Sequence, residues 1–147
     1  MMLLELLVAL TVVGLLATIA LPTYAAIIER QKVGEAGREL MEIAMVIERY
    51  RTMRFEIPET LTELGLDAHL LEDPWGRQYQ FLSFNSSIPG IKGMIRKDHN
   101  LHPLNSEFDL YSFGKDGQSQ SPLTANASRD DVIWARDGGF VGLAEDY

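Results

Sequence analysis

Hydrophobic and polar positions divide the chain into an unbroken apolar start, a periodic middle and a partly alternating remainder. The run from Leu6 to Ile28 carries no charge and, as a helix, is long enough to cross a bilayer core of roughly 30 Å. From Thr23 to Arg54 apolar residues recur at steps of three and four, with Glu and Arg on the opposite face. The two patterns join without a clear break, which predicts one continuous helix of about 50 residues.

Strand patterns come only after this helix. The helical signal ends at Ile57-Pro58, and Thr60 with Glu63 suggests a capping box at the start of a short helix or loop. Partly alternating stretches predict strands at Gln78–Phe84, Lys92–Arg96, Phe108–Phe113 and Val132–Ala135. The predicted fold class is therefore α+β, with a long N-terminal helix packed on a small antiparallel β-sheet. The predicted division is residues 1–28, an apolar helix that spans a membrane or packs on partner helices, and residues 29–147, its amphipathic continuation and a globular domain.

Composition excludes several classes of protein. A chain of 147 residues allows one compact domain with an appendage. Its net charge of −8 argues against a nucleic-acid binder, which needs a basic face to displace counterions. The chain has no cysteine, which excludes both a disulfide framework and a thiolate metal site.

Charges around the apolar run leave the orientation in a membrane open. A secretory signal peptide fits poorly, because no Lys or Arg precedes the run and the first cation is Arg30. Arg30 and Lys32 follow the run, and the positive-inside rule would then place the remainder in the cytoplasm. If a basic leader has been removed from in front of Met1, the orientation reverses.

Glu5 is an isolated acid among leucines, and it is the first candidate functional residue. An acid buried in a membrane is costly and usually has a partner. The nearest cation is the α-amino group of Met1, which is largely protonated at neutral pH. Glu5 can meet the positive end of its own helix, or the Met1 of a second, axially staggered chain. A third interpretation leaves the carboxylate hydrated near the headgroups.

Gly14 and Pro22 bound the weakest part of the predicted helix. Pro22 has no N–H for the carbonyl of Thr18, and Gly14 lowers helix stability. The segment between them is predicted to melt or stretch. The alternative is a routine kink, of the kind that membrane helices tolerate.

The first residues carry a resemblance to a known family. MLLELLVALTVVGLLATIALPTY resembles the mature N-terminus of type IV pilin-like proteins, with Glu5, Pro22 and Tyr24 at the family's positions. The resemblance implies that a basic leader has been removed, which places the C-terminal domain in the periplasm. It also implies that the α-amine of Met1 is methylated, and that Glu5 pairs with the Met1 of a neighbouring subunit in a filament.

Three later stretches narrow the resemblance. DPWGRQYQF, EFDLYSFGKDG and RDDVIWA are similar to the major pseudopilin of type II secretion systems. In that family the C-terminal loop is braced by calcium, an ion that takes six to eight oxygen ligands. The stretch from Gln118 to Arg129 is longer than the family's usual connection. The ligands that the resemblance implies are the carbonyls of Phe113 and Gln118 with Asp116, Ser128, Asp130 and Asp131. From the residues alone, a hydrated acidic loop is the alternative.

The resemblance implies a structural subunit and not an enzyme. It would polymerise into a helical pseudopilus that drives protein export, with an inner-membrane assembly platform, minor pseudopilins and an outer-membrane secretin as partners. No Ser or Thr has a recognisable base and orienting acid. His99 and His102 are predicted in a surface loop, and Trp75 and Trp134 as core or interface aromatics. The alternatives are the major subunit of a surface pilus-like fibre and a membrane-tethered periplasmic domain that never polymerises.

Overall fold

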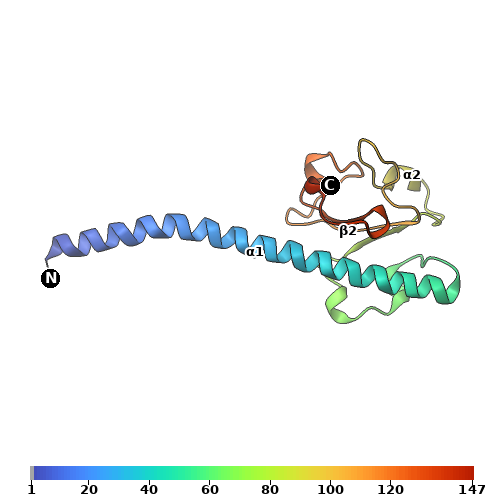
Figure 1. Cartoon of the computed structure of the whole chain (residues 1–147), viewed down its shortest axis with the longest axis horizontal. Helices are drawn as coiled ribbons and strands as arrows, with labels where there is room; N and C mark the ends of the chain where they lie inside the picture. Colours follow the sequence, from blue (N-terminus) through green and yellow to red (C-terminus); the bar gives the residue numbers. More distant parts are fainter. Residues whose placement is uncertain (1) are drawn as a thin grey trace. The chain divides into compact units, whose positions relative to one another are not determined.

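The computed structural model describes residues 2–147, and its longest element is the helix α1 (Leu3–Arg54). This helix is continuous over 52 residues, which confirms the prediction of a single long helix. The chain divides into two compact units, one ending at Lys32 and the other formed by Val33–Tyr147. Figure 1 traces the chain through both units, and each unit is described by itself.

The first unit is helical and its apolar side chains are exposed. By length and composition α1 is long and apolar enough to cross a membrane, and no residue of its most apolar stretch is buried. Its few hydroxyls bond to the preceding turn: Thr11 Oγ1 donates to the carbonyl of Val8 at 2.8 Å, and Thr18 Oγ1 to that of Leu15 at 2.6 Å. The helix therefore offers no unsatisfied hydroxyl at these two positions to an apolar surrounding.

The second unit contains a four-stranded antiparallel sheet in the order β1-β2-β3-β4. Its strands are β1 (Gln80–Ser83), β2 (Phe108–Ser112), β3 (Val132–Ala135) and β4 (Phe140–Leu143). Phe81 pairs with Leu110, which in turn pairs with Trp134, and Trp134 pairs with Val141. Each strand thus pairs with the next strand along the chain, and the α+β fold class is confirmed.

The core lies between the second half of α1 and one face of the sheet. Leu40, Ile43 and Ile47 are spaced by three and four residues, and each has no exposed surface. They pack in one cluster with Phe108 and Trp134, whose rings stack at 4.8 Å between centroids. A smaller cluster includes Ile133, the residue between Val132 and Trp134 on β3, so both faces of the central strands are covered. The remaining members of the smaller cluster are Leu104, Leu123, Ala135 and Ala144.

One predicted strand was wrong, and one strand of the sheet was not predicted. Residues Lys92–Arg96 do not form a strand; the short helix α2 (Ile91–Met94) occupies this region. Gly90 adopts φ +79°, and the N–H of Ile95 then bonds to the carbonyl of Ile91 at 3.1 Å, so the chain turns helically where alternation suggested a strand. β4 was not predicted, because Gly142 interrupts a short apolar run that follows two further glycines.

Five short 3₁₀ helices complete the described part of the chain. They are η1 (Leu61–Leu64), η2 (Ala68–Leu70), η3 (Asn126–Ser128), η4 (Arg136–Gly138) and η5 (Ala144–Asp146). The predicted short helix after Thr60 is confirmed, because the N–H of Thr60 donates to Glu63 Oε1 at 3.0 Å at the start of η1. His99 and His102 are exposed, as predicted for a surface loop.

Candidate functional site

Glu5 lies in the first turn of α1 and is exposed in the single chain. Its Oε2 accepts a hydrogen bond from the backbone N–H of Met2 at 3.0 Å, while its own N–H bonds to the carbonyl of Met2 at 3.0 Å. Glu5 thus caps its own helix, which is one of the two pairings considered from the sequence. Met1, the predicted partner in a second chain and the predicted site of methylation, lies outside the described residues.

The segment from Gly14 to Pro22 is helical throughout in this single chain. A Cβ added at Gly14 would meet nothing within 4 Å, so no neighbouring group in the described structure requires a glycine there. Melting of the segment during assembly stays a prediction.

The DPWG motif builds a turn around Asp73. Its Oδ1 accepts hydrogen bonds from the N–H groups of Trp75 and Arg77, at 3.0 and 2.9 Å, and Gly76 closes the turn at φ +79°. Its Oδ2 accepts a hydrogen bond of 2.5 Å from Ser112 Oγ, and Asp73 is buried. Asp73 therefore joins the first of the three motifs to the second.

The second motif continues from Ser112 into the turn that the resemblance assigns to calcium. The N–H of Gly114 donates to Ser112 Oγ at 3.0 Å. The guanidinium of Arg77 then donates to the carbonyl of Gly114 at 2.7 Å and to that of Lys115 at 3.5 Å. Backbone carbonyls of this turn are thus already bound by an arginine.

Asp116 and Asp130 are close together at the exposed side of the loop. Asp130 Oδ2 accepts a hydrogen bond from the N–H of Asp116 at 2.8 Å, and Asp116 Oδ1 accepts one from the N–H of Gln118 at 2.7 Å. Gly114 approaches the carbonyl of Asp130 so closely, at φ +64°, that a Cβ there would overlap it. The two arms of the loop are thereby held against each other through backbone groups.

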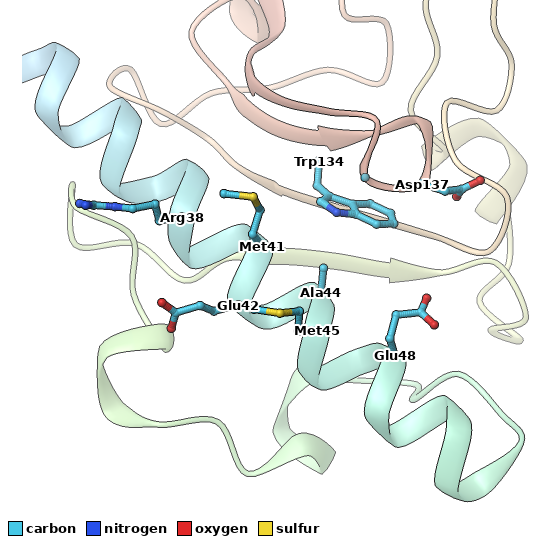
Figure 2. Close-up of a pocket in the computed structure, with 9 residues that line it drawn as sticks. Arg38, Met41, Glu42, Ala44, Met45, Glu48, Trp134 and Asp137 are labelled. Atoms are coloured by element: carbon cyan, nitrogen blue, oxygen red, sulfur yellow. The ribbon is translucent and has the colours of Figure 1, made fainter.

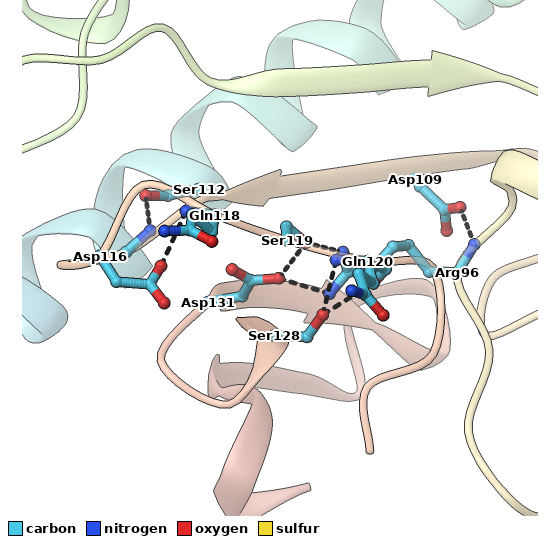
Figure 3. Close-up of polar contacts among 10 residues, drawn as sticks. Arg96, Asp109, Ser112, Asp116, Gln118, Ser119, Gln120, Ser128 and Asp131 are labelled. Atoms are coloured by element: carbon cyan, nitrogen blue, oxygen red, sulfur yellow. Dashed lines mark hydrogen bonds and ion pairs between the residues drawn. The ribbon is translucent and has the colours of Figure 1, made fainter. Parts of the chain in front are cut away.

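The side chains of Asp131 and Ser128 bind other protein groups and are buried. Asp131 has no exposed surface, and its Oδ2 lies 2.6 Å from Arg96 Nη2 and 2.5 Å from Ser119 Oγ. Ser128 is equally buried, and its hydroxyl accepts from the N–H of Gln120 and donates to the carbonyl of the same residue. Figure 3 shows Asp131 directed toward Ser119 and Arg96, with Asp116 directed toward Gln118.

The predicted acidic ligands bind different protein groups: Asp131 binds Arg96 and Ser119, whereas Asp116 and Asp130 accept from backbone N–H groups. Among residues 2–147 no three His, Cys, Asp or Glu side chains form a group that could hold a metal ion. Asp131 Oδ2 and the Ser128 hydroxyl are bound by protein groups, whereas Asp131 Oδ1 has no hydrogen-bond partner among the described residues. The acidic side chains of the implied ligand set do not form a group that could hold a metal ion in the described part of the chain, and calcium binding stays a prediction.

Arg96 was not predicted as a site residue, although one signal was present. It is a cation at the end of the predicted strand Lys92–Arg96, where apolar alternation implies burial, and its exposure is only 2%. Its guanidinium also lies over the ring of Tyr111 at 4.3 Å from the centroid. Burial raises the pKa of Asp131 to about 6, while Ser119 and Arg96 oppose this shift, so the carboxylate is ionised at neutral pH.

Asp109 is a second buried acid on the same side of the sheet. Its Oδ2 accepts a hydrogen bond from the backbone N–H of Arg96 at 2.7 Å, and its Oδ1 one from Asn105 Nδ2 at 3.2 Å. Burial raises the pKa of Asp109 to about 6 in spite of these donors.

An apolar groove of about 570 Å³ lies between α1 and the end of β3 in the second unit. Figure 2 shows Met41, Met45 and Trp134 along it, with Glu48 and Asp137 at one end. Met41 and Met45 are 46% and 65% exposed.

The fold and the three linked motifs define an α+β protein with a bare apolar N-terminal helix and a turn-rich domain joined to it. The chain is similar to the type II secretion system core protein G of Pseudomonas aeruginosa, with 28% identity over 137 aligned positions that cover 79% of this chain and 82% of the relative. No family model matches the chain. No solved structure matches it. The resemblance indicated by the motifs is thereby confirmed.

Proposed function

We propose that this protein is a structural subunit that polymerises into a helical pseudopilus-like filament of a type II secretion system. The observation that carries the proposal is the helix segment from Leu3 to Leu21, in which every residue is exposed although the domain that follows has a closed core. Exposed apolar surface of this extent needs lipid or other apolar helices around it. Similarity to a secretion-system core protein supports other apolar helices, packed in a filament, as the functional surrounding.

Two successive surroundings satisfy this segment. In the bacterial inner membrane, α1 anchors the monomer with its C-terminal domain in the periplasm. In the filament, the same segment packs against its copies in neighbouring subunits and forms an apolar core. The globular domain needs no change between the two states, because its core is complete within residues 33–147.

Glu5 gives the assembly its register. Its carboxylate already accepts the N–H of Met2, so it lies at the start of the chain, where a neighbour's terminal ammonium can approach it. An ion pair formed inside an apolar filament core is stabilised by the low dielectric constant and penalises any stagger that leaves the carboxylate unpaired. The partners expected for this subunit are further copies of itself, an assembly platform, minor pseudopilins and a secretin. The role is structural and involves no catalysis.

Substitution of Glu5 tests the proposal. We expect Glu5→Leu to abolish polymer in material sheared from cells, measured by negative-stain electron microscopy and sedimentation. Glu5→Asp, which keeps the charge, should restore part of the polymer. Thr11→Val is the matched control, because the Thr11 hydroxyl bonds only within its own helix, to Val8. It removes a polar group from the same segment and should leave polymer yield unchanged.

The domain provides the second control. Its melting temperature, followed by fluorescence of Trp75 and Trp134, should be the same in Glu5→Leu as in the wild type, since both tryptophans lie in the second unit. Wild-type polymer yield from Glu5→Leu would refute the proposed pairing. A wild-type protein that stays monodisperse in cells that contain the whole secretion system would refute polymerisation itself.

A further inference from the structure

The loop that connects β2 to β3 is contacted by two arginines: Arg96 binds Asp131, one of the ligands that the resemblance implies for calcium, and Arg77 binds carbonyls in the turn between the implied ligands Phe113 and Asp116. We propose that the guanidinium groups of Arg77 and Arg96 brace this loop in place of a metal, so that the loop is folded without calcium. The proposal is independent of whether the protein polymerises, because every contact that it uses lies within residues 73–131.

Arg96 supplies the cation for the second arm of the loop. Its Nη2 lies 2.6 Å from Asp131 Oδ2, and the two side chains are 3% and 0% exposed. Ser119 Oγ donates to the same Asp131 oxygen at 2.5 Å and also accepts a hydrogen bond from Arg96 Nη1. The ring of Tyr111 covers the guanidinium at 4.3 Å. The guanidinium thus neutralises the carboxylate that the resemblance assigns to the metal, inside a closed site (Figure 3).

Arg77 supplies the cation for the first arm. Its guanidinium donates to the carbonyls of Gly114 and Lys115, in the turn where carbonyl ligands were predicted. Gly117, at φ +70°, lies against this guanidinium so closely that a Cβ would overlap it. The backbone of Arg77 is fixed in turn by Asp73, so its side chain leaves the turn from a fixed position.

A divalent ion at the same carboxylate would be unfavourable beside these groups. Asp131 has one oxygen bound to Arg96 and Ser119, and its other oxygen, Oδ1, is buried with no hydrogen-bond partner among the described residues. An ion bound to Oδ1 would place two further positive charges next to a desolvated guanidinium, where repulsion is weakly screened. One arginine already balances the charge of the carboxylate, and calcium is not needed for that purpose.

Melting of the full chain in detergent, with and without calcium, tests the proposal. The wild-type melting temperature, followed by tryptophan fluorescence, should be the same in excess EGTA and in millimolar CaCl₂. A melting temperature that falls in EGTA or rises with CaCl₂ would overturn the proposal. This measurement on the unmodified protein remains decisive even where a variant does not fold.

Variants separate the ion pair of Arg96 with Asp131 from general charge effects. Arg96→Met leaves the Asp131 carboxylate buried without its cation and should lower the melting temperature by about 10 °C in either solution. The double variant Arg96→Met/Asp131→Leu removes both charges and should recover part of this loss. Arg129→Met is the matched control, since it removes an exposed guanidinium from the same loop and should leave the melting temperature unchanged. An Arg96→Met protein that melts like the wild type would overturn the proposal, as would a double variant with no recovery.

Discussion

The two ends of α1 share one helix but contrast in burial. Leu10 is 69% exposed in the first unit, whereas Leu40 in the second unit has no exposed surface. The apolar residues of the second unit recur at steps of three and four and face a sheet. The apolar side chains of the first unit lie on all sides of the helix, so a neighbour that packs against one face would leave the others exposed.

This contrast separates what the chain does alone from what it needs other molecules to do. In residues 33–147 the apolar stripe is matched by strands of the same chain, so the domain can be tested by its stability. In the first unit the apolar surface has no such match among the described residues, so its effects should be found in membrane insertion or assembly. The same substitution made in each unit should therefore give different outcomes.

Paired leucine substitutions should show the largest difference. Leu40→Ala removes a fully buried side chain and should lower the free energy of unfolding of the domain by about 2–5 kcal/mol. Leu10→Ala removes an exposed side chain in the first unit and should leave the domain's stability unchanged. The measurement is denaturant-induced unfolding in detergent, followed by tryptophan fluorescence. Equal losses from the two substitutions would contradict the separation.

Two acids provide a second comparison, in the pH dependence of stability. Burial in the domain raises the pKa of Asp109 to about 6, from an ordinary value of 3.8. The folded domain binds the proton more tightly than the unfolded chain, so this group's contribution to stability falls as pH rises from about 4 to about 6. The loss amounts to about 3 kcal/mol, the free-energy equivalent of the shift.

Asp109→Asn removes this titration. The unfolding free energy of the variant, relative to the wild type, should therefore increase by about 3 kcal/mol between pH 4 and pH 7. A fixed penalty for the altered hydrogen bonds to Asn105 and Arg96 should be superimposed and independent of pH. Glu5→Gln is the matched control, because Glu5 lies outside the second unit and its substitution should leave the pH profile of the domain unchanged. A parallel pH profile for Asp109→Asn and the wild type would refute the prediction.

Periodicity and turn residues predict most of this fold, because they are local properties. The length of α1, the capping box at Thr60 and the strand Val132–Ala135 all follow from short-range patterns, and the structure confirms them. The strand expected at Lys92–Arg96 failed because Gly90 initiates a helical turn that overrides alternation. β4 was missed because its pairing with β3, and not its own composition, makes it a strand.

The candidate site was less predictable, because its contacts join distant parts of the chain. Asp131 was singled out from its motif, but its partner Arg96 lies 35 positions earlier in a segment whose structure was predicted wrongly. Arg77 directly follows the DPWG motif, yet its contact with Gly114 spans 37 positions. A motif can indicate which residues converge, whereas the identity of the cation that they meet depends on the tertiary fold.

Two glycines in α1 give the smallest expected effect on stability and the sharpest test of the difference between the two units. Gly14 and Gly34 both lie inside the helix, and a Cβ added at either would meet nothing within 4 Å. Alanine should therefore be tolerated sterically at both positions and should favour the helix by about 0.5–1 kcal/mol. For Gly34→Ala, in the second unit, this gain should appear as a slightly higher melting temperature of the domain with unchanged polymer yield.

We expect Gly14→Ala to change polymer yield and not the stability of the domain. The domain's melting temperature should stay the same, while the stiffer segment between Gly14 and Pro22 should reduce polymer yield severalfold if that segment must stretch to fit the filament. Pro22→Ala, which restores a donor for the carbonyl of Thr18, should reduce the yield in the same direction. Polymer yield is measured by sedimentation of sheared material, and membrane insertion of each variant by carbonate extraction. Normal yield from both variants would show that the segment stays helical in the filament, as it is in the single chain, and that the apolar unit assembles as a rigid rod.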